Sequence, residues 1–211
     1  MQQKKLYLLF TLFILLLTVV VTNFNKSSRQ QMEIHQSSKI GLQLLMNGPI
    51  IEPFSLLNQL SEPTDESIFD NKYTLLFFGF TFCPDICPIT LAHLANTNFN
   101  LSANEEIQTI FVTVDPSRDS SEKINAYLNN FSHSFIGLTG EESALKNLWS
   151  QLGIAVHQIN NADGANYNVT HSGVVFLISP TYQIIGIVSN ITSPADIEQP
   201  FKELISRHKE I

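Results

Sequence analysis

The cysteines of this chain lie together in its most distinctive stretch, TLLFFGFTFCPDICPIT, residues 74–90. Cys83 and Cys87 are the only 2 cysteines among 211 residues, and they stand in a C-x-x-x-C spacing. A buried structural cysteine gains nothing from a neighbour of its own kind, so this spacing points to chemistry rather than to packing. A thiol pair can form a disulfide, attack the disulfide of a partner, bind Cu(I) or supply half of a zinc site.

The residues around the pair predict a loop between a strand and a helix. The apolar, aromatic-rich run of residues 73–80 is typical of a strand buried on both faces. Pro88 suits the first position of a helix, because its fixed φ fits there and its missing N–H is not needed. A residue before proline is disfavoured in the α region, so we expect Cys87 at the N-cap. The positive end of the helix dipole would then favour the thiolate of Cys87, the form that binds metal or attacks disulfides.

A metal site built on these thiolates needs a further donor, for which histidine is the candidate type. The chain contains His35, His93, His133, His157, His171 and His208. We expect His35 and His208 to be solvated near the two ends, and His93 to be exposed on the first helix. His133 falls in a turn, and His157 is interpreted as a structural histidine. His171 stands apart, because it directly precedes a strongly apolar segment and its loop would fall beside the cysteine loop. The residues alone leave it open whether His171 is a surface residue or a donor.

Strand and helix signals alternate along the rest of the chain. Strands are predicted at about residues 54–57, 73–80, 107–114, 135–138, 154–159, 174–179 and 183–189. Helices are predicted to begin at Pro88, at Ser120 or Ser121, at a capping box of Thr139 and Glu142, and at Ser193. Residues 160–168, NNADGANYN, are interpreted as a loop. Alternating elements that end in a hairpin and a helix predict an α/β domain, a three-layer thioredoxin-like fold with a central mixed β-sheet.

Residues 1–22 predict a membrane anchor. Lys4 and Lys5 precede the uncharged apolar run Leu6–Thr22, which at ~1.5 Å per residue spans roughly 25 Å of a ~30 Å hydrocarbon core. A cleaved signal peptide would need small residues at its cleavage site, and the stretch TVVVTNFNKSS has no A-x-A pattern. We expect a single-pass helix with its lysines inside and the domain on the periplasmic or an equivalent extracytoplasmic side, which is oxidising.

The segments that follow differ in character. Residues 23–47 are mostly polar and are interpreted as a tether, and residues 48–211 as the folded domain. That length is sufficient for one domain with a hydrophobic core. The formal net charge of −7 argues against nucleic acid as a partner, since nucleic-acid binding needs a basic face.

Three segments, in this order, resemble the Sco/SenC family of membrane-anchored copper chaperones: TFCPDICPITLAHL, VDPSRDS and NYNVTHSGVVFLISP. The resemblance covers roughly residues 50–208, and the predicted anchor agrees with it. It implies a thioredoxin-like fold and a copper site whose ligands correspond here to Cys83, Cys87 and His171. It further implies that support of the site, rather than ligation, falls to Asp85, Asp115, Arg118 and Asp119.

By that resemblance, the chain is expected to bind one copper ion, as Cu(I) and in some states Cu(II). It would deliver this ion for assembly of the binuclear copper centre of cytochrome c oxidase, with an oxidase subunit as the accepting partner. A competing hypothesis is a thiol–disulfide oxidoreductase that keeps partner cysteines reduced through Cys83 and Cys87, so enzyme activity is left open. Dithiol enzymes of this fold usually carry C-x-x-C, and the extra spacer residue favours a metal. Zinc with a bound water, and a stabilising disulfide, are further alternatives.

Overall fold

Strand β4, Lys72–Gly79, is the centre of the fold because both of its edges are paired. It runs parallel to β5, Glu106–Thr113, and antiparallel to β9, Val175–Ile178. The side chains of residues 75–78 are fully buried, as the apolar run predicts for a strand covered on both faces. Parallel and antiparallel pairing on one strand makes the sheet mixed, which confirms that part of the predicted fold class.

The computed structural model describes residues 18, 41–45, 48–97, 106–160 and 167–208. The sheet has 8 strands in the order β1-β10-β9-β4-β5-β6-β2-β3. Its remaining strands are β1 (Leu42–Leu44), β2 (Leu56–Asn58), β3 (Pro63–Thr64), β6 (Ile136–Thr139) and β10 (Ile184–Val188). The helices are η1 (Glu66–Phe69), α2 (Ile86–Ala95), α3 (Ser121–Leu128), α4 (Glu142–Gln151) and α5 (Ala195–His208).

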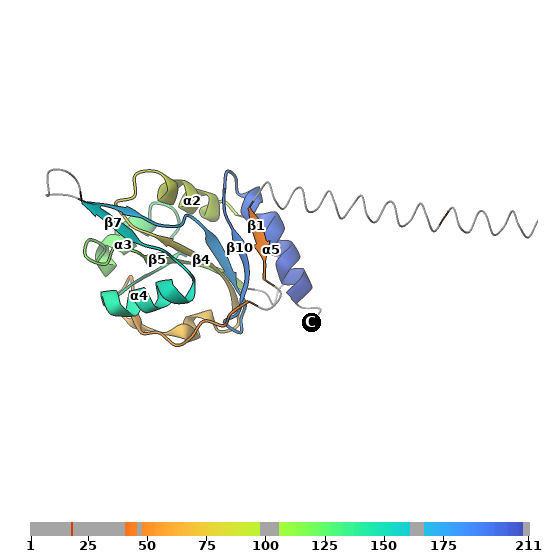
Figure 1. The fold of residues 1–211 in the computed structure, drawn as a ribbon, viewed down its shortest axis with the longest axis horizontal. Helices are drawn as coiled ribbons and strands as arrows, with labels where there is room; N and C mark the ends of the chain where they lie inside the picture. Colours follow the sequence, from red (N-terminus) through yellow and green to blue (C-terminus); the bar gives the residue numbers. More distant parts are fainter. Residues whose placement is uncertain (1–17, 19–40, 46–47, 98–105, 161–166, 209–211) are drawn as a thin grey trace, which may run out of the picture. The chain divides into compact units, whose positions relative to one another are not determined.

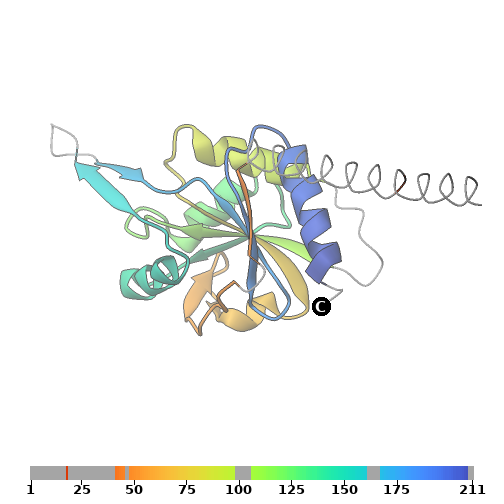
Figure 2. The same cartoon turned by 45° about the vertical axis from the view of Figure 1, so that its right-hand side comes forward.

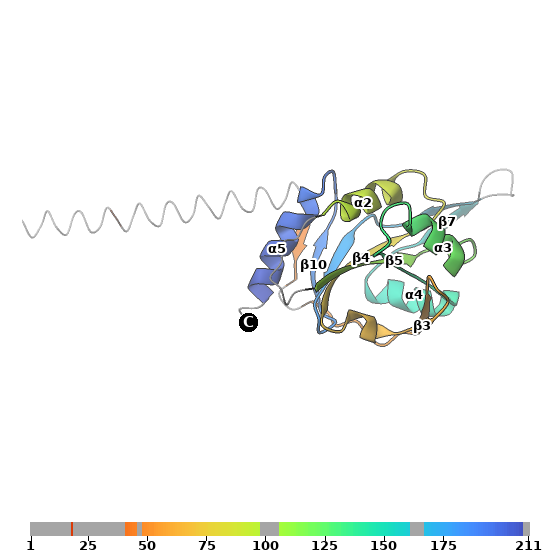
Figure 3. The same ribbon diagram turned by 180° about the vertical axis from the view of Figure 1, so that it is seen from behind.

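Helices cover both faces of the sheet, which gives the three layers that were predicted (Figures 1 and 2). Cys87 of α2, Ile124 of α3 and Leu204 of α5 all approach one face of the sheet, where they lie against glycines of β4, β6 and β10. Helix α4 lies on the opposite side, as the view from behind also shows (Figure 3). The described residues from 41 onward form one compact unit, and its core is a single cluster of buried apolar side chains.

A separate two-stranded ribbon projects from this body (Figure 1). Its strands β7, His157–Asn160, and β8, Tyr167–Thr170, are antiparallel, with His157 opposite Thr170. Strand β8 occupies part of the segment predicted to be a loop. Asparagine is depleted in strands, so the asparagines of this segment favoured a loop. The apolar–polar alternation of β8 extends over only four residues and was too weak to outweigh them.

Two predicted helix starts are wrong. Helix α2 has Asp85 at its N-cap, so Cys87 is the second helical residue instead of the cap. Pro88 is tolerated at the third position, because the first N–H groups of a helix have no intrahelical acceptor. Helix α4 has Glu141 at its N-cap without a side-chain hydrogen bond, and Thr139 lies in β6. The Thr139 hydroxyl instead donates to the backbone oxygen of Asp119 at 2.9 Å.

The segments before residue 48 are only partly described. Leu42–Leu44, within the expected tether, forms β1 and pairs with β10. The expected anchor, residues 1–22, lies outside the described residues except for Thr18. Among the residues that are described, none of the helices has the length and apolar character needed to span a bilayer.

Candidate metal site

The two cysteines lie where the central strand gives way to helix α2. Cys87 is fully buried, whereas Cys83 is partly exposed in the preceding turn, where its N–H donates to the oxygen of Phe80 at 3.1 Å. Gly79 ends β4 directly beneath the pair. A Cβ at this position would lie 3.0 Å from the Cys87 sulfur and 2.7 Å from the Phe111 ring. The absence of a side chain at Gly79 therefore makes the space that the Cys87 thiol occupies.

His171 reaches the same place from the other side of β4. Because Phe77 of β4 is paired with Val175 of β9, the segment after β4 and the segment before β9 meet at one edge of the sheet. The His171 ring packs edge-on against Phe77 and Phe80, with centroids 6.5 and 5.8 Å apart. Its Nδ1 lies 3.0 Å from the backbone oxygen of Ser172. Since a carbonyl only accepts, Nδ1 carries the proton in this contact and Nε2 presents a lone pair to the cysteines.

The donor atoms of Cys83, Cys87 and His171 all lie within 4.8 Å of one another, and 3.6 Å separates the Cys87 sulfur from the His171 Nε2. A metal ion about 2.3 Å from each sulfur and about 2.1 Å from nitrogen bridges a sulfur and a nitrogen up to roughly 4.4 Å apart, and two sulfurs up to roughly 4.6 Å apart. The cluster therefore matches one ion after a shift of well under an ångström. Two thiolates and an imidazole are donors that suit Cu(I).

The two thiols differ in acidity. A hydrogen bond from Cys87 is the main cause that lowers the pKa of Cys83 to about 4, with a smaller contribution from His171. The pKa of Cys87 is raised, first by its hydrogen bond with Cys83 and then by burial. Both cysteines are free thiols in this structure. These pKa directions favour the thiolate on Cys83, the more exposed sulfur, over Cys87, where the helix-dipole argument had placed it.

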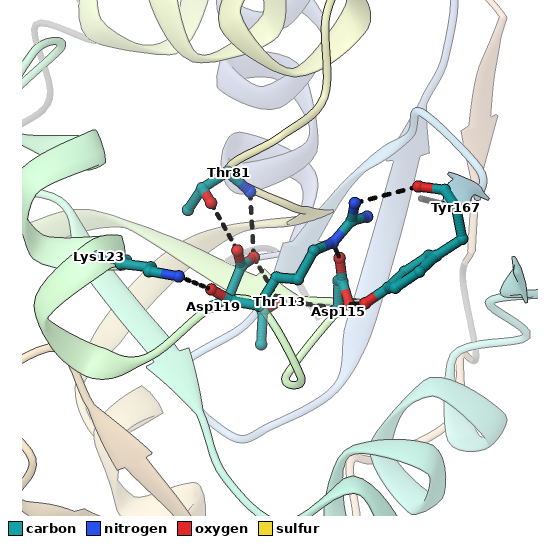
Figure 4. Close-up of polar contacts among 7 residues, drawn as sticks. Thr81, Thr113, Asp115, Asp119, Lys123 and Tyr167 are labelled. Atoms are coloured by element: carbon teal, nitrogen blue, oxygen red, sulfur yellow. Dashed lines mark hydrogen bonds and ion pairs between the residues drawn. The ribbon is translucent and has the colours of Figure 1, made fainter. Parts of the chain in front are cut away.

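A loop between β5 and α3 holds the cysteine segment in place (Figure 4). The buried carboxylate of Asp119 accepts hydrogen bonds from the Thr81 N–H at 3.0 Å and the Thr81 hydroxyl at 2.6 Å. It also accepts one from the Thr113 hydroxyl at 2.7 Å. Burial is the main cause that raises the pKa of Asp119. These bonds fix the backbone two residues before Cys83.

The same loop also contacts the strand that leads to His171 (Figure 4). Asp115 is 4% exposed and accepts hydrogen bonds from the Arg118 Nε at 2.5 Å and from the Tyr167 hydroxyl at 2.6 Å. Arg118 donates a further bond from Nη1 to the Tyr167 backbone oxygen at 3.0 Å. The loop therefore touches both segments that carry candidate ligands.

The remaining histidines lie elsewhere. Outside the three donors, the described part of the chain holds no other histidine, cysteine or acidic cluster with this geometry. His93 is partly buried in α2, and the exposed ring of His133 bonds Asn129 at 2.9 Å. His157 is exposed in β7, which contradicts a structural interior role, and His208 contacts the Tyr73 hydroxyl at 3.3 Å instead of being merely solvated. His35 is outside the described residues.

Sequence reasoning missed the polar partners that organise the site. Thr81, Thr113 and Tyr167 were not singled out. The first two donate hydrogen bonds to Asp119, and Tyr167 donates one to Asp115. Tyr167 had a signal, since it stands four residues before His171 in the alternating segment YNVT. Asp85, which was expected to support the site, is exposed and its side chain makes no capping bond to α2, but its backbone hydrogen bond to Cys83 helps to lower the pKa of that thiol.

Comparisons with known proteins agree with this geometry. A family model described as SCO1/SenC matches residues 44–206. The chain is 37% identical over 128 residues to an SCO2-like protein of Rickettsia prowazekii and 31% identical over 182 residues to the mitochondrial SCO1 homolog 2 of Arabidopsis thaliana. These matches cover 60% and 84% of this chain, and 62% and 66% of the relatives. About a third of each relative thus lies outside the match.

Among solved structures, the chain is similar to Arabidopsis thaliana ScoI with copper bound. The two are 28% identical with a TM-score of 0.70, and the match covers 75% of this chain and 99% of the other. That similarity confirms the thioredoxin-like Sco fold.

Proposed function

This chain belongs to the SCO1/SenC family, and from that premise we propose that it is a copper chaperone. Cys83, Cys87 and His171 bind one copper ion, and the chain delivers this ion for assembly of the binuclear copper centre of cytochrome c oxidase. The accepting partner is a subunit of that oxidase. The copper-bound Arabidopsis structure supports the choice of metal.

The observation that carries this proposal is the convergence of three donors from two distant segments. Their atoms lie within 4.8 Å of one another, and the described part of the chain offers no comparable cluster. Soft thiolates favour Cu(I), and copper exceeds zinc in affinity for such donors. Cys83 is the more exposed of the two sulfurs, so an acceptor's own ligand would approach the ion from that side.

The binding test compares the reduced full chain, loaded anaerobically with Cu(I), with Cys83→Ser, Cys87→Ser and His171→Ala. The matched control is His133→Ala, which removes an exposed histidine bonded to Asn129. We expect about one copper per wild-type or control chain, loss of the metal with either serine, and weaker binding with His171→Ala. Wild-type affinity in His171→Ala would exclude the histidine as a ligand. Delivery is tested by transfer to the metal-free copper-binding domain of the oxidase.

A second function, thiol–disulfide exchange, is favoured by one observation, the low pKa of the partly exposed Cys83. Its thiolate would attack a partner disulfide, form a mixed disulfide and release one partner thiolate. Cys87 would then lose its proton, attack the Cys83 sulfur and release the second partner thiolate. The partner gains two electrons and this chain is left with a Cys83–Cys87 disulfide. Reduction of the oxidase cysteines by the copper-free chain, with no copper uptake, would favour this function over the first.

We also propose that residues 1–22 anchor the chain, so that the domain faces an extracytoplasmic compartment where copper insertion occurs. The mitochondrial relative from Arabidopsis thaliana is in line with a membrane-bounded compartment. Extraction of the expressed chain from membranes with detergent, but not with alkaline carbonate, is the expected result. Release by carbonate would contradict an anchor.

A further inference from the structure

The strand that leads to His171, β8, has no hydrogen-bonded partner in the main sheet. Strands β7 and β8 pair only with each other, outside the main sheet. A cavity of about 460 Å³ separates this ribbon from helix α4, and its walls include Trp149, Val156 and Tyr167. Neither main-sheet pairing nor close packing against α4 holds β8, so polar contacts at its first residue become important beside the packing of Val169 against the core.

Those contacts converge on Tyr167. Its hydroxyl donates to the buried Asp115, its backbone oxygen accepts from Arg118, and its ring lies under the Arg118 guanidinium at 3.8 Å. Charge-assisted bonds and cation–π stacking strengthen in a partly buried site. The contacts therefore hold both the backbone and the side chain of the first residue of β8.

Arg118 reaches the cysteine segment at the same time. Its guanidinium carbon lies 5.1 Å from the centroid of Phe82, which precedes Cys83, and 5.8 Å from that of Phe80. Phe80 is also the ring against which His171 packs. One arginine thus lies between the segment that carries the cysteines and the strand that leads to the histidine.

The alternation of side chains along β8 links the position of Tyr167 to the orientation of His171. Tyr167 and Val169 are half-buried, whereas Asn168 and Thr170 are exposed. Side chains two and four residues apart share one face of a strand, so His171 follows on the inward face that Tyr167 begins. A shift of β8 by one residue would turn the imidazole away from the sulfurs.

We propose that Arg118 and Tyr167, held by Asp115, are positioning residues that set His171 as the third copper ligand. This inference rests on the proposed function, because it assigns a role within the same site. Neither residue contacts the metal. Both act on the register and orientation of the strand that leads to His171.

The experiment measures Cu(I) affinity by competition with a chromophoric chelator in the full chain. The test variants are Tyr167→Phe and a double variant that combines Asp115→Asn with Arg118→Met. The double variant removes both charges of the ion pair, so no unpaired charge is left at the buried position. Tyr182→Phe is the matched control for the tyrosine, since Tyr182 also donates to an aspartate, Asp70, away from the copper site. Arg207→Met, which removes an exposed arginine on α5, is the control for the arginine. Each variant is made with His171 present and with His171→Ala.

With His171 present, the test variants should weaken Cu(I) binding by about 10- to 100-fold, as loss of outer partners of metal ligands does. X-ray absorption should show both sulfurs retained and the nitrogen ligand lost. With His171→Ala, the same changes should cost less than about twofold, because the ligand they position is already gone. A nitrogen ligand that persists in both test variants, or an equal loss in the two backgrounds, would overturn the proposal.

A copper-free measurement separates this proposal from the function it rests on. In the metal-free chain, amide hydrogen exchange across residues 167–175 should speed up in Tyr167→Phe and remain unchanged in Tyr182→Phe. If the wild-type chain takes up no copper, the proposed function fails, and this exchange experiment still decides whether Tyr167 holds the strand. Unchanged exchange in Tyr167→Phe would contradict the positioning role.

Discussion

The two cysteines are chemically unequal because their surroundings differ. Cys83 is partly exposed and accepts a hydrogen bond from the Cys87 thiol. Cys87 is buried in the first turn of α2, with its sulfur beside Gly79 of β4. A thiolate on one member of the pair discourages ionisation of the other, since two adjacent negative charges repel. The helix-dipole argument from sequence favoured Cys87, but it did not include the hydrogen bond with Cys83 and the burial that raise the pKa of Cys87.

This inequality predicts which cysteine reacts first. The pKa of Cys83 is lowered from 9.0 to about 4, so its thiolate is fully formed throughout the range from about pH 5.5 to about pH 8. Alkylation of the metal-free chain by iodoacetamide should therefore label Cys83 first, at a rate nearly independent of pH. An ordinary thiol would react about tenfold faster for each pH unit gained.

Mass spectrometry of the digested chain identifies the labelled residue. Chain unfolded in urea serves as the control, in which both cysteines should react with the pH dependence of a free thiol. Labelling of Cys87 before Cys83 in the folded chain would contradict the assignment of charge.

At the scale of elements, the loop between β5 and α3, residues 114–120, bonds both the cysteine segment and β8. Asp119 lies in the core and yet carries a carboxylate that three donors satisfy. Burial outweighs these bonds, so the pKa of Asp119 is raised above 3.8. A raised pKa in the folded state means that the protonated carboxyl favours folding more than the carboxylate does.

The sign of the pH dependence follows. Compared with Asp119→Asn, which cannot titrate, the wild-type chain should gain free energy of unfolding as the pH falls through the raised pKa. The gain is complete below 3.8 and is lost as the pH rises through the raised pKa. Urea unfolding of both chains, at a series of pH values, measures this difference.

Asp65→Asn is the control with the opposite sign. Hydrogen bonds from Ser67 lower the pKa of Asp65, so that carboxylate stabilises the fold above its unfolded pKa and its contribution disappears as the pH falls. If the two substitutions gave the same direction of change, the raised pKa of Asp119 would be refuted.

Much of the fold was predictable at this scale, because its signals are local. The buried run of β4, the alternation of β5, the Ser120 cap of α3 and the hairpin of β9 and β10 all follow from a few neighbouring residues. The failures have physical reasons. Leu42–Leu44 is only 3 residues long, too short to give an alternation signal, and it forms a strand where it pairs with β10.

The candidate site was predictable in its members and in the meeting of its two loops, but not in its detailed contacts. The cysteine spacing and the family resemblance identified Cys83, Cys87 and His171 as candidates, and the structure brings their donor atoms together. The predicted order of elements placed the His171 loop beside the cysteine loop, and the pairing of β4 with β9 agrees with it. Local patterns could not supply the register of that pairing. Nor could they show that Tyr167 bonds Asp115, because the two are 52 residues apart in the chain.

The whole molecule should respond to copper because its donors come from distant segments. His171 lies 84 positions after Cys87 in the chain. Only folding brings the histidine and the cysteines together. A ligand that binds the folded chain alone stabilises it by about 4 kcal/mol when its free concentration is about 1,000 times its Kd. For a domain of this size, each kcal/mol raises Tm by about 2–4 °C.

Cu(I) buffered at that concentration should therefore raise the Tm of the reduced chain by roughly 8–16 °C, and a strong Cu(I) chelator should reverse the rise. Thermal unfolding followed by circular dichroism measures both states. At the same free copper concentration, His171→Ala should show a smaller rise, because its weaker binding lowers the ratio of free copper to Kd. The Cys83→Ser and Cys87→Ser variants should show none.

A chain whose Tm is unchanged by Cu(I) while the metal remains bound would show that copper binds the unfolded chain equally well. In that case the two cysteines alone, which lie close together in the sequence, would account for the binding, and the meeting of distant segments would not be needed.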